Sequence, residues 1–65
     1  MDEGEARIRL QGLTIEHADL KDAIDALMDQ AHTDQLQIAR MKRKKLRLKD
    51  EIERLKDFLN PDLIA

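Results

Sequence analysis

The chain has 65 residues, a formal net charge of −2 and no cysteine. This length allows one small domain, and the lack of cysteine excludes disulfides and thiolate metal sites. His17 and His32 are the two histidines, too few for a self-contained zinc site. A composition rich in Leu, Ile, Ala and charged residues is typical of long helices and coiled coils. With no secretory signal or membrane span in the sequence, we expect a cytosolic protein, or one carried by another protein.

The first predicted helix covers residues of about 4–31. Its apolar positions recur at alternating intervals of four and three residues. This heptad spacing keeps one stripe of a helix, here called the seam, against a partner helix. Gly12 interrupts the helix and should destabilise it by about 1 kcal/mol relative to alanine. The seam of this helix comprises Leu10, Leu13, His17, Leu20, Ile24 and Leu27, with Ala6 and Ala31 at its ends.

A turn at about 32–33 leads into the second predicted helix, which covers residues of about 34–60. Asp34 and Gln37 resemble a capping box at its start. Asn60-Pro61 ends it, because proline disfavours helical geometry in the preceding residue. Residues 61–65 form a short tail. The seam of the second helix comprises Ile38, Met41, Lys45, Leu48, Ile52 and Leu55, followed by Leu59.

Two long helices joined by a short turn become antiparallel neighbours. We therefore predict an all-α fold, an antiparallel two-helix coiled-coil hairpin that forms a single unit over residues 1–65. With the turn near residue 33, Leu13 should face Ile52 and His17 should lie near Leu48. The polar seam residues His17 and Lys45 should fall close together, with buried stems and outward-turned heads, and fix the register.

One seam is thin support for a fold, so we expect the hairpin to self-associate into a helical bundle. Apolar residues outside the seam offer an oligomer or docking face: Ile8, Ile15, Leu46 and Phe58. The alternative is a weakly stable monomer on which these are ordinary scattered surface residues.

Residues 40–49 include seven lysines and arginines. Four of them share one side of the second helix and should point away from the first: Arg40, Arg43, Lys44 and Arg47. We call these four the cationic stripe. A charge run on a helix is usually a solvated or salt-bridged face, which is the favoured interpretation. The alternatives are an anion-binding stripe for nucleic acid, whose phosphates attract such residues, or an acidic protein partner. Against nucleic acid stand the acidic balance of the chain and the lack of an aromatic residue in the run.

No catalytic constellation is present, since serine and cysteine are absent and neither threonine has a fixed base beside it. We expect no catalytic residue, no cofactor, no metal site and no small-molecule substrate. Asp22, Asp25 and Asp29 share a helical face, but a straight helix spreads carboxylates apart instead of converging them on a cation.

Several segments resemble the YdcH-like family of small bacterial proteins, a domain of unknown function. They are His17-x-x-Leu20, Ile24-x-x-Leu27, the stretch MKRKKLRLKDEIERL at 41–55, and the ending PDLIA. The resemblance covers nearly the whole chain, and residues 44–52 are its most specific part. It implies a bacterial, cytosolic helical hairpin and carries over no catalytic residue, cofactor or substrate.

Together these features predict a non-enzymatic helical interaction module that binds other helices, its own or a partner's, through the seams. The alternative is a nucleic-acid-associated accessory protein that uses the cationic stripe. In a third interpretation the chain is an accessory subunit that docks through Ile8, Ile15 and Phe58.

Overall fold

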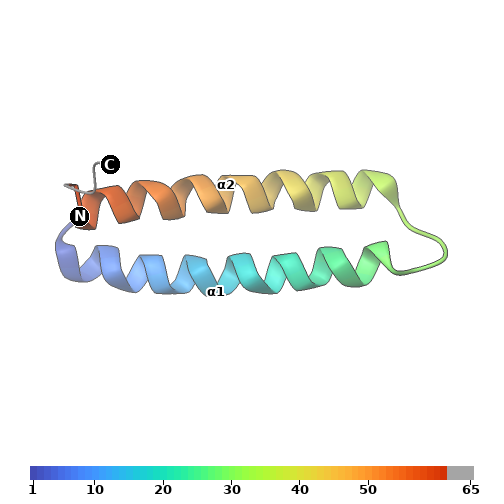
Figure 1. Ribbon diagram of the computed structural model, residues 1–65, viewed down its shortest axis with the longest axis horizontal. Coiled ribbons are helices and arrows are strands. Elements are labelled where there is room, and N and C mark those ends of the chain that lie inside the picture. The colour runs from blue at the N-terminus through green and yellow to red at the C-terminus, as the bar shows by residue number, and fades with distance from the viewer. Residues whose placement is uncertain (62–65) are drawn as a thin grey trace.

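A computed structural model describes residues 1–61, while the tail residues 62–65 lie outside the described part. Helix α1 spans Glu3–Met28 and helix α2 spans Gln35–Leu59. The helices run antiparallel side by side, with the connection at one end and the start of α1 and the end of α2 at the other (Figure 1). The rod measures 45 × 24 × 15 Å along its principal axes. The predicted all-α helical hairpin is confirmed.

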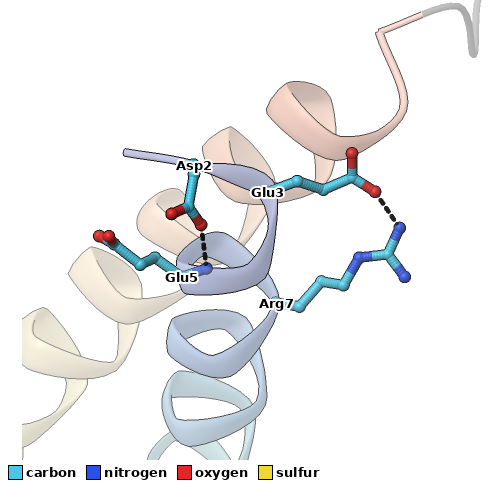
Figure 2. A network of polar contacts seen from close by, with 4 residues as sticks. All are labelled: Asp2, Glu3, Glu5 and Arg7. Atoms are coloured by element: carbon cyan, nitrogen blue, oxygen red, sulfur yellow. Dashed lines mark hydrogen bonds and ion pairs between the residues drawn. The ribbon is translucent and has the colours of Figure 1, made fainter.

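Helix α1 begins with a side-chain cap. The Asp2 carboxylate accepts a hydrogen bond from the Glu5 backbone N–H at 2.7 Å (Figure 2). One turn later, the Arg7 guanidinium donates to the Glu3 carboxylate. Acidic residues in the first turn also favour the positive end of the helix dipole. The cap and the acids therefore fix the start of α1, even though Gly4 lies within its first turn.

Helix α1 ends at Met28, about three residues before the expected position. The chain then forms a tighter turn, in which the Gln30 N–H donates to the Leu27 carbonyl at 3.2 Å. Ala31, the expected last seam residue, is exposed. Because tertiary packing supplies most of the stability of a helix in a protein, a last turn with no partner has little reason to remain helical. The connection between the helices is consequently longer than the expected turn.

Helix α2 is capped by Asp34, whose Oδ1 accepts from the N–H groups of Leu36 at 3.0 Å and Gln37 at 3.1 Å. Within residues 1–61, the Gln37 side chain makes no return bond to Asp34, so the cap is one half of a capping box. The helix ends at Leu59, directly before Asn60-Pro61.

The core is a single layer of side chains between the two helices. The buried residues all belong to the two heptad repeats: Ala6, Ile24, Ile38, Leu48, Ile52 and Leu55. The other predicted seam residues are half-buried, including Leu10, Leu13, His17, Leu20, Leu27, Met41 and Lys45. With a layer this thin, each fully buried side chain carries a large share of the stability.

The predicted seam residues contribute to grooves on the two flanks of the seam. His17, Lys45 and Ile52 line one groove, and Leu13 and Leu48 line the other. On the same flank as Leu13, an ion pair joins Arg9 to Glu51.

We predict that Leu48→Ala lowers the free energy of unfolding by about 2–4 kcal/mol, since it removes buried methyl groups from the only core layer. Leu48 is 6% exposed, and Leu36, in the same helix, is 75% exposed. The matched control Leu36→Ala should change the free energy of unfolding by less than about 0.5 kcal/mol. Urea denaturation followed by circular dichroism measures both. Equal effects of the two substitutions would contradict the assignment of the core.

Candidate functional site

One flank of the hairpin carries a groove of about 700 Å³ between the helices. We call it the arginine groove. Its α2 wall includes the whole cationic stripe, whose four side chains are all exposed. The expectation that the stripe points away from the first helix is therefore wrong, because α1 forms the facing wall. The groove is lined by Arg9, Leu13, Glu16, Arg40, Arg43, Lys44, Arg47, Leu48 and Glu51.

Carboxylates of both helices lie in the arginine groove among the cations. Glu51 of α2 accepts from the Arg9 guanidinium at 2.7 Å, and Glu16 of α1 lies on the wall opposite the stripe. Both members of the ion pair are about half exposed, so the bond contributes about 0.2–1 kcal/mol, and its main effect is on register. Each wall of this groove thus contains at least one cation and one acid.

The opposite flank carries a second groove of about 430 Å³, which we call the lysine groove. Lysines from both helices line it, and its single acid, Glu53, belongs to α2. In the described part of the chain, the ion pairs within 4 Å are Arg7–Glu3 and Arg9–Glu51, so no lysine of this groove has one. The lining residues are Thr14, His17, Lys21, Lys45, Lys49, Ile52, Glu53 and Lys56.

His17 forms part of the lysine groove from its position on the α1 seam. Its Nε2 atom is buried and has no hydrogen-bond partner among the described residues. The expectation that His17 turns its polar head outward is therefore wrong for this nitrogen. A buried polar atom without a partner destabilises the folded state by about 1–3 kcal/mol.

The proposed docking residues are exposed, at 73% for Ile8, 57% for Ile15, 57% for Leu46 and 53% for Phe58. They do not form one face. At about 100° per residue, Ile8 and Ile15 lie on the side of α1 opposite buried Ala6. Leu46 and Phe58 belong to α2, on two different sides of that helix. Only the two isoleucines, seven residues apart on one helix, make a common surface.

Gly12 lies between the two isoleucines on the outer side of α1. A Cβ added there would meet nothing within 4 Å. The glycine is therefore not required by any contact within the hairpin, although it weakens the helix.

Residues 1–61 contain no cluster of three or more His, Cys, Asp or Glu side chains placed to hold a metal ion. Asp22, Asp25 and Asp29 are each exposed along α1. In the same range, no helix has the length and apolar character needed to cross a membrane.

The family model described as a protein of unknown function, DUF465, matches residues 10–56, which is more than half of the chain. The chain belongs to the DUF465 family. The resemblance to YdcH-like proteins is confirmed, since these are members of that family. No curated protein and no solved structure shows significant similarity to the chain. The matched region of this DUF465 hairpin includes the connection between the helices, the lysine groove, and the arginine groove except for Arg9.

Sequence reasoning identified the cationic stripe but missed the lysine groove. Lys21 and Lys56 lie apart from the basic run at 40–49, and Lys49 is the last residue of that run. The sequence did contain the pattern needed to find them. Lys49 and Lys56 are seven residues apart, and each of the three lysines directly follows a seam residue. Extending the heptad to its flanking positions would have placed all three on one side.

We predict that His17→Leu raises the free energy of unfolding by about 1 kcal/mol, because it removes a buried nitrogen with no partner and keeps an apolar side chain in the seam. The control His32→Leu alters an exposed histidine of the connection. It should change the free energy of unfolding by less than about 0.5 kcal/mol. Thermal and urea denaturation at neutral pH measure both. A His17→Leu variant less stable than the wild type would show that the histidine has a favourable partner.

Proposed function

We propose that this DUF465 hairpin is a non-catalytic interaction module, and that it binds a second copy of itself through the outer side of α1. The observation that carries the proposal is Gly12, a glycine in a helix interior that faces open space between two exposed isoleucines. Because glycine weakens a helix, a glycine that relieves no internal contact is best explained by close approach of another chain.

The outer side of α1 around Ile8 and Ile15 is uncharged, although 40% of the chain is charged, and the exposed residues Arg9 and Glu16 lie along its edge beside Gly12. With 3.6 residues per turn, six exposed residues fall on the side of α1 opposite the seam. Removing water from an uncharged surface costs little free energy, whereas burying unpaired charges is strongly unfavourable. Asp19 and Asp22 end the strip on its C-terminal side. We call this surface the outer strip: Gly4, Ile8, Gln11, Gly12, Ile15 and Ala18.

The order of residues along the outer strip supports a second copy as the partner. A twofold interface brings one patch against itself, so the patch must be self-complementary. From either end, the strip has a small residue, an isoleucine, and then the pair Gln11-Gly12 at its centre. Two strips crossing antiparallel at this pair would place Ile8 of one copy opposite Ile15 of the other and Gly12 opposite Gln11, so that the smallest residue lies where the helices cross.

The charges that flank the strip determine how association should respond to salt. In the antiparallel arrangement, Glu5 of one copy lies near Asp19 of the other. These like charges repel, and added salt screens exposed charges over about 10 Å at 0.1 M. The interface is also smaller than the roughly 800 Å² per partner of a standard complex. We therefore expect a weak dimer that strengthens as salt is added.

Gly12→Ala distinguishes this proposal from a simple stability effect. The new methyl group should stabilise the isolated helix by about 1 kcal/mol and raise the melting temperature of the dilute hairpin. It should also weaken association, because it keeps the two helices apart. Sedimentation equilibrium over a concentration series, with circular dichroism of dilute samples, measures both effects.

Ile15→Asp provides the second test, and Leu46→Asp is its matched control, because both residues are 57% exposed. Ile15→Asp should abolish association and leave the hairpin helical, whereas Leu46→Asp should leave association unchanged. The proposal fails if the wild type stays monomeric at every concentration, or if Gly12→Ala associates more tightly than the wild type.

A second candidate function is nucleic-acid binding by the arginine groove. The observation that favours it is the position of the cationic stripe along one wall of a single groove, with Arg9 on the other. This function predicts binding that weakens steeply with salt, as phosphate contacts do. The charge reversals Arg43→Glu and Arg47→Glu, combined in one variant, should abolish retention of a DNA or RNA probe in a filter-binding assay. Salt-independent retention, or equal retention of that variant, would exclude this function.

A further inference from the structure

The two grooves differ in how their charges are arranged, although each carries a formal charge of +3. In the arginine groove, the acids Glu16 and Glu51 come from both helices, and one of them is already paired with Arg9. In the lysine groove, both helices contribute cations, and α1 contributes no acid. In the lysine groove, therefore, no described acid of α1 lies across the seam from the lysines of α2.

Lys21 of α1 and Lys45 of α2 line one groove together with Lys49 and Lys56, and like charges held close together repel. Lys45 is half-buried at a seam position, where repulsion is screened less than at the surface. An anion seated among these four lysines would relieve the repulsion, so binding and folding are coupled.

The shape of the groove and the identity of its cations indicate what kind of anion fits. Lys45 and Lys56 are eleven residues apart on one helix, which corresponds to about 16 Å at 1.5 Å per residue. The cations are all lysines, which bind phosphate as compact point charges. Among the described lining residues, none is an aromatic side chain on which a base could stack.

We infer that the lysine groove is a binding site for a linear oligophosphate, a small molecule with several linked phosphate groups. Lys21 closes the groove from α1, and Lys45, Lys49 and Lys56 line its α2 wall. His17 lines the groove between its two walls. The site is separate from the outer strip, so it does not depend on self-association.

The test is a titration of the hairpin with inorganic tripolyphosphate at low ionic strength, followed by amide and histidine-ring NMR shifts. Shifts should concentrate at His17, Lys21, Lys45 and Lys49, and the ligand should raise the melting temperature. The double variant Lys49→Gln/Lys56→Gln should bind about tenfold more weakly, as expected for the loss of two exposed charge contacts.

The matched control is Arg43→Gln/Arg47→Gln, which removes the same charge from the arginine groove. It should change the affinity for tripolyphosphate by less than about twofold. Equal weakening by the two double variants would overturn the inference, since it would indicate attraction to the overall positive field of α2. So would sulfate producing the same shifts at the same ionic strength.

A short oligothymidylate separates a free oligophosphate from the backbone of a nucleic acid. The inference predicts that it binds more weakly than tripolyphosphate, because the groove is short and its described lining offers no stacking platform. Tighter binding of the oligothymidylate that also depends on Lys49 and Lys56 would overturn the assignment to a small molecule.

Discussion

The apolar seam between α1 and α2 is the interaction on which the rest of the structure depends. Two helices in contact can bury only the stripe that each turns toward the other, and here that stripe supplies a single layer of core residues. Without the layer, neither helix has enough packing to persist in water. Because the layer is so thin, the flanks and outer sides of both helices remain exposed. Those surfaces are where the hairpin meets other molecules.

The two polar residues of the seam give the hairpin its asymmetry. His17 and Lys45 lie near the middle of an otherwise apolar stripe, and both face the lysine groove. On the other flank, Arg9 and Glu51 join the helices with opposite charges. Both grooves thus have cations on both walls, but only the arginine groove has an ion pair between the helices and an acid on its α1 wall. This difference is why an anion-binding site is assigned to the lysine groove and not to the more conspicuous cationic stripe.

The sequence was sufficient for the fold because the heptad spacing and the signals at the helix ends agree with one another. Asp34 caps α2 as its position suggested, and Asn60-Pro61 follows the last helical residue. The end of α1 was harder to predict, since Ala31 continues the repeat but has no partner across the hairpin. A heptad specifies a stripe on each helix, whereas grooves depend on the relative position of two helices, which only the structure supplies.

Gly12 weakens helix α1, and the proposed self-association through the outer strip gives a reason for a glycine at this position. The most direct test of this self-association is cysteine cross-linking, because a disulfide forms only when two Cα atoms approach to about 4.4–6.8 Å. Gln11→Cys places a thiol at the centre of the strip, and Asp57→Cys places an equally exposed one on α2. On mild oxidation, the account predicts a covalent dimer of the Gln11→Cys variant that forms much faster than that of the Asp57→Cys variant. Equal rates for the two variants would contradict it.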